Sequence, residues 1–352
     1  RSVTIGVVDC DYCNNATYIK NCYLVFGSGE SEDCYYSDNL VKAKNAFDSA
    51  YSNSVELIYE TFNSKYCNRS FFVLDCENCN DIMFCRDCRG VSYCFGCVGL
   101  RNKSYYIFNK PYSKEAYKSY LNGLEFGSYK IFLELKDKIE KFWLEYPVKF
   151  MHGSHNNNVV GEYIYNSKNV MNGWQIIGGE NLKYCQGLFT GVPRDSYDSY
   201  RLFYNNELIY ESMVCGHDIL KLKFCFECHP ACSNLTYCIW CMNCSDCFGC
   251  IGLRNKRYCI LNKQYSKEEY EALVPKIIQH MNDMPYMDKK GRVYKYGEFF
   301  PTELSPFCYN ETIAQEYFPL TKEQAIEQGY TWKDPEPRNY QIDLNTEQLP
   351  DS

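Results

Sequence analysis

The segment Cys67–Cys97, CNRSFFVLDCENCNDIMFCRDCRGVSYCFGC, repeats cysteine at intervals of nine residues. Its cysteines form two series offset by three residues: Cys67, Cys76, Cys85 and Cys94, and Cys79, Cys88 and Cys97. The pattern returns between Cys225 and Cys259, again as two series: Cys238 and Cys247, and Cys232, Cys241, Cys250 and Cys259. A short fixed period indicates a solenoid, in which each unit buries its inner face only against its neighbours.

Cysteines three residues apart point to opposite faces of a regular strand, so both can face inward only if the chain turns a corner between them. Nine residues are too few for a full turn around a filled core. We therefore interpret nine residues as half a coil, about 18 residues per turn, with coils stacked about 4.8 Å apart. The sequence predicts a mainly β protein made of two tandem cysteine-ladder β-solenoid lobes, β-helix-like, each followed by capping helices.

The second lobe repeats the first. The segment CFGCVGLRNK at Cys94–Lys103 recurs as CFGCIGLRNK at Cys247–Lys256, which is 247 − 94 = 153 residues later. Upstream, ELIYE at Glu56–Glu60 recurs at Glu207–Glu211, an offset of 207 − 56 = 151. Because an insertion of two residues reconciles the offsets, the sequence indicates duplication of the whole lobe.

Four parts follow from this pattern. We expect a first solenoid lobe at 1–112, capping and connecting helices at 113–150, a second solenoid lobe at 151–265, and a helix with an aromatic, proline-rich strap at 266–352. The hydrophobic period changes from two to about 3.6 where the helices are expected to begin. A solenoid end exposes an unpaired edge, so a helix laid over the last coil is the expected use of these segments.

The simplest interpretation of the cysteines is that they are small apolar side chains in a narrow interior, since free cysteine is usually buried. The 34 tyrosines and 21 phenylalanines would then flank them, closing the wider parts of the core and covering its surface. In an oxidising compartment, stacked coils would instead place cysteines within disulfide range. The ladder cysteines are Cys67, Cys76, Cys79, Cys85, Cys88, Cys94, Cys97, Cys238 and Cys259.

Metal binding is a third interpretation. The run of Cys-x-x-Cys steps from Cys241 to Cys250 has the spacing of thiolate ligands for zinc or an iron–sulfur cluster. Another group lies off the regular register and includes a histidine. The candidate ligands are Cys225, Cys228, His229, Cys232, Cys241, Cys244, Cys247 and Cys250. Since the nine-residue ladder explains most of this spacing without metal, we expect no cofactor, with zinc or an iron–sulfur cluster as the alternative.

The repeated Leu-Arg-Asn-Lys motif offers two basic pairs, Arg101 with Lys103 and Arg254 with Lys256. Each pair is a candidate for binding an anion or phosphate. The alternative is structural: the motif ties the end of the solenoid to its helical cap. No set of nucleophile, base and oxyanion donors occurs together, nor a phosphate-binding glycine loop, so we do not expect an enzyme.

Composition limits the partners. The chain of 352 residues has a net charge of −7, which argues against a sequence-independent grip on phosphates and hence against direct nucleic-acid binding by this region. No apolar run approaches the roughly 18 residues of a membrane span. The chain opens without methionine or a signal peptide, so we expect a processed product or a fragment. Free thiols at this density favour a reducing cytoplasm, with the cell surface or exterior as the alternative.

The cysteine ladders, the CFGCIGLRNK segment at 247–256 and GEFFP at 297–301 resemble an uncharacterised family of cysteine-rich repeat proteins from bacteria of the candidate phyla radiation (Patescibacteria). The resemblance covers nearly the whole chain. It implies two cysteine-rich lobes, normally flanked by zinc-ribbon-like segments that this chain lacks, and no established activity.

A non-enzymatic structural or binding scaffold is therefore the leading expectation, since solenoids present long, stiff surfaces. Its partner would be a protein or a ribonucleoprotein, and the missing ribbons would mediate association with nucleic acid or the ribosome. A metal- or iron–sulfur-binding protein and a disulfide-stabilised surface or filament protein are the alternatives.

Overall fold

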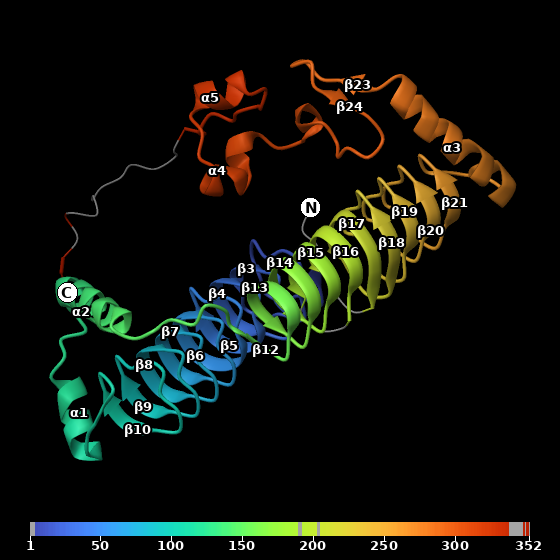
Figure 1. Cartoon of the computed structure of the whole chain (residues 1–352). Coiled ribbons are helices and arrows are strands. Elements are labelled where there is room, and N and C mark those ends of the chain that lie inside the picture. The colour runs from blue at the N-terminus through green and yellow to red at the C-terminus, as the bar shows by residue number, and fades with distance from the viewer. Residues whose placement is uncertain (1–3, 189–191, 203–204, 338–347, 349, 352) are drawn as a thin grey trace. The chain divides into compact units, whose positions relative to one another are not determined.

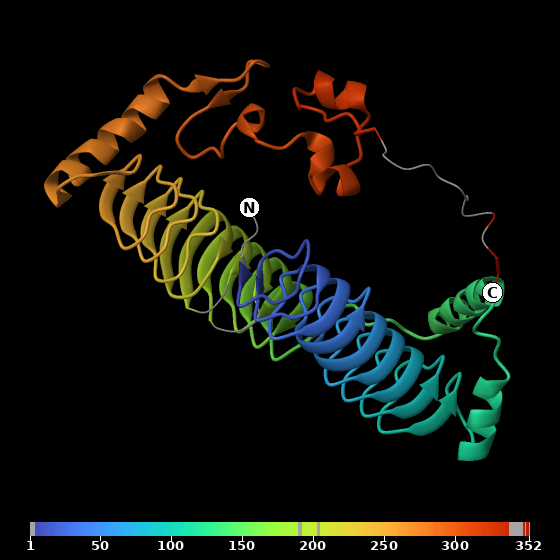
Figure 2. The ribbon, with the colours of Figure 1, turned by 180° about the vertical axis from the view of Figure 1, so that it is seen from behind.

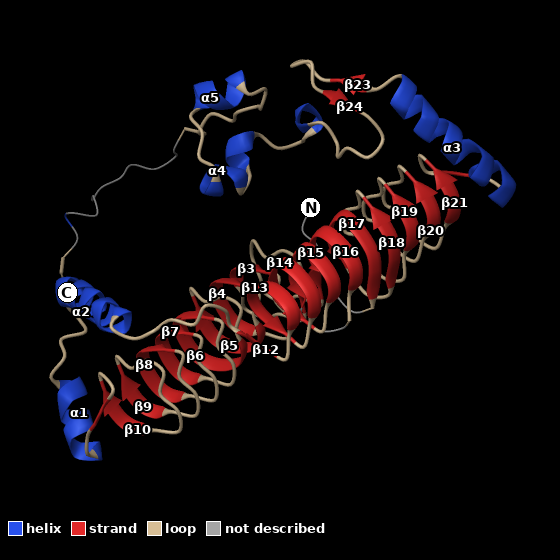
Figure 3. Ribbon diagram, in the orientation of Figure 1, coloured by secondary structure: helices blue, strands red, loops and turns tan. Residues whose placement is uncertain are grey.

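The computed structural model describes residues 4–188, 192–202, 205–337, 348 and 350–351. The chain divides into two compact units, one formed by 1–148 with 341–352 and the other by 149–340. Each unit contains one lobe of stacked coils, blue to green in the first and green to orange in the second (Figure 1). Figure 3 shows the strands of both lobes in red. The predicted mainly β, β-solenoid fold is confirmed.

In the first lobe a parallel ladder runs in chain order from β3 to β10, and β11 turns back to pair antiparallel with β10. The strands are β1 Thr4–Ile5, β2 Ala16–Thr17, β3 Tyr23–Phe26, β4 Glu32–Asp38, β5 Val41–Phe47, β6 Asn53–Phe62, β7 Asn68–Leu74, β8 Asn80–Arg86, β9 Ser92–Phe95, β10 Ser104–Ile107 and β11 Lys110–Pro111.

The coil length differs from the prediction. Glu32 pairs with Lys44, Val41 with Asn53 and Asn68 with Asn80, so each residue lies beside the one 12 positions later. The predicted coil of about 18 residues is therefore wrong, and the first lobe has 12 residues per coil. The prediction failed because it followed the cysteines alone, which fill only some of the inward positions.

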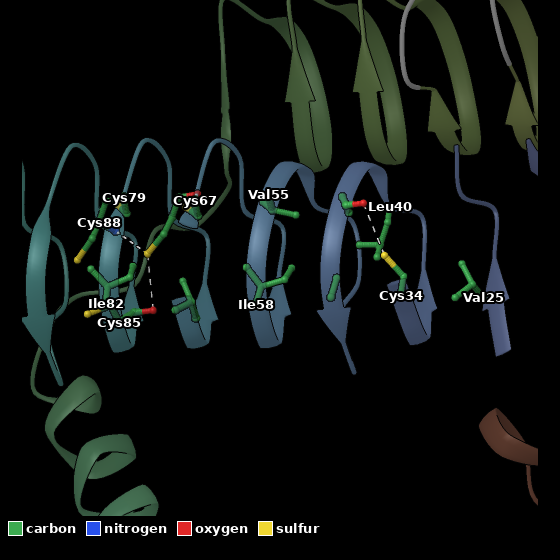
Figure 4. Packing of buried hydrophobic residues seen from close by; sticks show 14 of the residues in the cluster. Val25, Cys34, Leu40, Val55, Ile58, Cys67, Cys79, Ile82, Cys85 and Cys88 are labelled. Atoms are coloured by element: carbon green, nitrogen blue, oxygen red, sulfur yellow. Dashed lines mark hydrogen bonds between the residues drawn. The ribbon is translucent and has the colours of Figure 1, made fainter. Parts of the chain in front are cut away.

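A three-residue unit builds this coil. From Gly6 to Phe108 every third residue has a positive φ, and from Cys13 to Cys97 the residue that follows it is buried. The left-handed residue turns the chain, so one side chain in three points inward and each coil has four sides. The predicted corner within each Cys-x-x-Cys is present. Figure 4 shows such inward side chains, among them Cys34 and Ile58, from successive coils.

The nine-residue cysteine period equals three of these units. Because a coil has four such units, the next cysteine of a series lies one unit short of a full turn later, on the neighbouring side of the coil and close to its predecessor. The thiol of Cys67 donates to the carbonyl oxygen of Cys76 at 3.5 Å, and the thiol of Cys76 donates to the carbonyl oxygen of Cys85 at 3.6 Å. Serine occupies equivalent inward positions. The Ser49 hydroxyl, for example, donates to the carbonyl oxygen of Phe47 at 2.8 Å. The interior thus accepts any small side chain whose polar atom reaches a nearby carbonyl.

The second lobe follows the same plan with parallel strands from β12 to β21 and an antiparallel β22. They are β12 Gly153–Ser154, β13 Asn157–Tyr165, β14 Lys168–Ile177, β15 Glu180–Leu188, β16 Arg194–Leu202, β17 Asn206–Cys215, β18 Ile219–Lys223, β19 Ser233–Thr236, β20 Ser245–Phe248, β21 Arg257–Ile260 and β22 Lys263–Gln264. Figure 2 shows the coils of each lobe from behind.

Extra residues lengthen some coils of the second lobe. Leu220 pairs with Ser233, an offset of 13, and Glu180 with Arg194, an offset of 14, whereas Ser245 pairs with Arg257 at 12. Within the Leu220 coil the positive-φ residues include Glu227 and Ala231, four apart instead of three. One corner therefore absorbs the extra residue while the strands stay in register.

A hairpin strand and helices close the C-terminal end of each ladder. After β11 come α1 Lys114–Asn122 and α2 Tyr129–Leu144, and after β22 comes α3 Lys267–Asp283. Ser113, Ser128 and Ser266 cap them through hydrogen bonds from backbone N–H groups. The last strand edge is paired by β11 or β22, while α1 contacts β10 and α3 contacts β21.

The rest of the second unit is built from short elements: β23 Tyr286–Met287, β24 Val293–Tyr294, η1 Thr302–Leu304, η2 Tyr309–Glu311, α4 Ala314–Tyr317 and α5 Lys322–Glu327. A capping box between Thr321 and Gln324 starts α5. Among the described residues, no helix is long and apolar enough to cross a membrane.

Candidate functional site

The ladder cysteines lie in the interior of the two lobes. All nine are at most 2 % exposed, and the 22 described cysteines are free thiols. Burial raises the pKa of Cys76 and Cys85 well above the usual value, and it raises the pKa of Cys185 to about 12. These three thiols are therefore protonated near neutral pH, and this fits small apolar side chains in a narrow core.

The cysteines proposed as metal ligands belong to the same interior. Cys241, Cys244 and Cys247 take consecutive inward positions, and Cys250 stands one coil beyond Cys238. Each of these thiols donates to a backbone carbonyl. For example, the Cys241 thiol donates to the carbonyl oxygen of Cys250 at 3.6 Å. Among the described residues, no three His, Cys, Asp or Glu side chains form a group that could hold a metal ion.

The irregular spacing of Cys225, Cys228, His229 and Cys232 has a structural cause. It falls at the four-residue corner between Glu227 and Ala231, where the lobe absorbs one extra residue. The three cysteines remain buried on either side of that corner. Burial, and then the nearby His217, lower the pKa of His229, so the neutral imidazole is favoured.

The basic candidates lie at the exposed ends of the lobes. Arg101, Lys103, Arg254 and Lys256 are all exposed. The Arg101 guanidinium donates to the carboxylate of Asp87 at 3.1 Å, to the Asp87 carbonyl, and to the Leu100 carbonyl at 3.0 Å. Because these contacts fasten the last corner to the preceding coil, they favour the structural alternative over an anion site for this residue.

One outer face of the first lobe carries aromatic side chains on consecutive coils. We call it the aromatic face; its outward pairs recur every 12 residues, from Asp11 and Tyr12 to Ile107 and Phe108. Neighbouring rings touch: Tyr23 and Tyr36 lie 5.6 Å apart, and Tyr35 stacks on Phe47 at 5.0 Å. Its aromatic residues are Tyr12, Tyr23, Tyr35, Tyr36, Phe47, Tyr59, Phe71, Phe72, Phe84, Phe95 and Phe108.

Helices cover the C-terminal part of this face. On α2, Phe132 lies 5.0 Å from Phe72, and Phe142 lies 5.1 Å from Phe108. Ile139 of α2 is fully buried against the same cluster, which also receives Tyr117 of α1. The aromatic face of these coils is therefore an intramolecular interface.

The coils nearer the N-terminus expose the same face. We call this part the open strip: Asp11, Tyr12, Tyr23, Leu24, Tyr35, Tyr36, Phe47 and Asp48. Tyr12 is 73 % exposed, Tyr36 56 % and Phe47 40 %. The strip contains two carboxylates and no lysine or arginine. Contiguous apolar exposure of this kind marks interaction surfaces.

Beside α1, a groove of about 390 Å³ runs along the edge of the aromatic face. Phe71, Met83 and Tyr117 give it an apolar lining. At its rim the Arg69 guanidinium pairs with the Asp81 carboxylate through Nε at 2.5 Å and Nη2 at 2.7 Å. The groove thus combines apolar surface with a fixed charge pair.

The second lobe covers its corresponding aromatic residues with α3 and the strap. Tyr270 of α3 belongs to the cluster that contains Phe224 and Tyr237. The Tyr237 hydroxyl donates to the Glu298 carbonyl at 2.9 Å and accepts from the Gly297 N–H at 3.1 Å. In both lobes, a segment that follows the solenoid packs on this face.

Sequence reasoning missed the aromatic face because it counted tyrosine and phenylalanine without assigning them a side of the coil. The signal was available: Tyr23, Tyr35, Phe47, Tyr59 and Phe71 are spaced by 12 residues. That period is also the coil length.

Comparisons with known proteins add little. No family model and no curated protein matches the sequence. A solved structure from Desulfovibrio desulfuricans G20, described provisionally as an acetyltransferase, matches with 12 % identity over 82 % of this chain and 85 % of its own, at a TM-score of 0.14. At that TM-score the match carries no argument.

Proposed function

We propose that the protein is a non-enzymatic scaffold that binds a partner protein on the aromatic face of its first lobe. The observation that carries this proposal is the open strip, where aromatic rings are exposed on consecutive coils. On later coils, helices cover the rings at the same positions of the repeat. The inward side chains of the first lobe are buried and pack against one another, so we assign recognition to the outer surface. Membership of the resembled bacterial family would be consistent with a scaffold but assigns no partner.

The acidic character of the strip favours a protein over a nucleic acid. Asp11 and Asp48 flank the rings, and the chain as a whole carries a net charge of −7. Nucleic-acid binding surfaces need clustered lysine and arginine. Any association with nucleic acid or the ribosome would accordingly use segments other than these lobes.

Site-specific photo-cross-linking in cells tests the proposal. A photoreactive phenylalanine analogue replaces Tyr12 or Tyr36 on the strip, and in matched controls it replaces Tyr18 or Tyr66 on another side of the coil. All four tyrosines have positive φ and are at least 56 % exposed, so the variants differ chiefly in the face they report. We expect both strip positions to cross-link the same partner. Equal cross-linking from the control positions, or none from the strip, would contradict the proposal.

A further inference from the structure

We propose that the open strip is a docking site for an amphipathic α-helix of a partner protein, whose apolar face lies on the rings and whose basic side chains meet the strip's carboxylates. This inference rests on the proposed scaffold function and names the chemical class of its partner. Three features of the first lobe support it.

The first is continuity with an interface that already holds a helix. Phe72, under α2, stands three coils after Tyr36 at the same position of the repeat, since 72 − 36 = 36 residues. On the covered coils the helix offers Phe132 and Ile139 to the rings. The open strip presents the same kind of surface on the same side of the solenoid without such a cover over Tyr36.

The second is charge. The ammonium of Lys136 on α2 lies 3.2 Å from the carboxylate of Glu60, and Lys138 lies 5.2 Å from the centre of the Phe108 ring. Asp48 precedes Glu60 by one coil and is exposed. A docked helix with a lysine beside its apolar face would meet Asp48 as Lys136 meets Glu60.

The third is length. The strip extends over four coils, hence three steps of about 4.8 Å or roughly 14 Å. At 1.5 Å per residue, this length corresponds to a helix of about 10 residues, or nearly three turns. An isolated helix of that length is marginal in water, so it would gain its order on binding, as amphipathic helices do in apolar grooves.

The chain supplies its own probe. A fluorescein-labelled peptide with the sequence of Ser128–Glu145, which contains α2, is titrated with the full chain and followed by fluorescence anisotropy. The test variant is Tyr12→Asn with Tyr36→Asn, and the matched control is Tyr18→Asn with Tyr66→Asn. Asparagine suits all four positions because it tolerates the left-handed conformation. We expect the strip variant to bind at least about tenfold more weakly and the control to bind within about twofold of the parent chain.

Two further measurements keep the inference falsifiable. The peptide with proline in place of Leu135 cannot form a continuous helix and is expected to lose binding. If the double asparagine variant fails to fold, Asp48→Lys provides a second test, with weaker binding expected at low salt. Any of three results would overturn the inference. The parent chain shows no saturable binding, the strip and control variants bind the peptide equally, or the proline peptide binds as tightly as the original peptide. In the last case, strip cross-links in cells would still support the scaffold and leave only the helical partner refuted.

Discussion

The three-residue unit predicts a large penalty for a β-branched residue at a corner. Asn63 has a φ of 47°, and its side-chain amide donates to the Asp75 carboxylate on the next coil at 2.6 Å. Asn63→Val would place a branched side chain in the left-handed region, at a cost of about 1–2 kcal/mol. It would also remove that hydrogen bond, worth about 1 kcal/mol. Together these effects lower the free energy of unfolding by about 2–3 kcal/mol.

Urea unfolding followed by circular dichroism, in the presence of a reductant, measures this change. Because solenoids need not unfold in one step, the first transition is compared among variants. Asn63→Gly keeps the left-handed corner and should cost only about 1 kcal/mol, through the lost hydrogen bond and a more flexible unfolded chain. Glu56→Val, at an exposed position of β6 outside the left-handed region, should change stability by less than about 0.5 kcal/mol. Equal stability of the valine and glycine variants would refute the corner argument.

Three more predictions concern the core and its cover. In the native protein, an aromatic disulfide reagent should rapidly modify only thiols such as Cys10 and Cys308, which are partly exposed. After denaturation the same reagent should modify all 23 cysteines. Rapid reaction of most thiols in the native protein would contradict the buried ladder. Burial raises the pKa of Cys185 and Cys232 from 9.0 to about 12, so at these two positions the folded state keeps protons that the unfolded state releases. Their contribution to stability should be full well below pH 9 and be lost between pH 9 and 12, by about 1.4 kcal/mol per thiol at pH 10. A urea midpoint that stays constant over this pH range would contradict the prediction. Ile139→Asp should detach α2 from the aromatic face, because it would bury a charge in an apolar cluster. The helix should become sensitive to proteases, while the strand signal in circular dichroism persists. A variant that resists proteases as well as the parent chain does would show that this contact is dispensable.

The sequence was sufficient for the class of fold because inward positions of a solenoid must recur at a fixed spacing. It was insufficient for the coil length because cysteine occupies only part of those positions. Between Cys67 and Cys76 the inward residues are Ser70 and Val73, and between Cys79 and Cys85 the inward residue is Ile82. A search for small or apolar residues at every third position would have identified the unit, although the number of units per coil needs the pairing of strands.

The candidate site was less predictable. The basic motif attracted attention because it is repeated, yet Arg101 bonds to its own solenoid through Asp87. The open strip carries no unusual motif; it is defined by which coils the helices reach. That reach depends on tertiary contacts such as Phe132 with Phe72, which no local pattern specifies.

The four-residue corner at Glu227–Ala231 has a consequence for how such a gene can change. One codon inserted at a bend leaves every downstream layer in place, and a duplication of 12 × 3 = 36 nucleotides would add a whole layer. Such insertions would lengthen a lobe without altering the packing of its other layers, so the length of a solenoid can evolve independently of its cross-section.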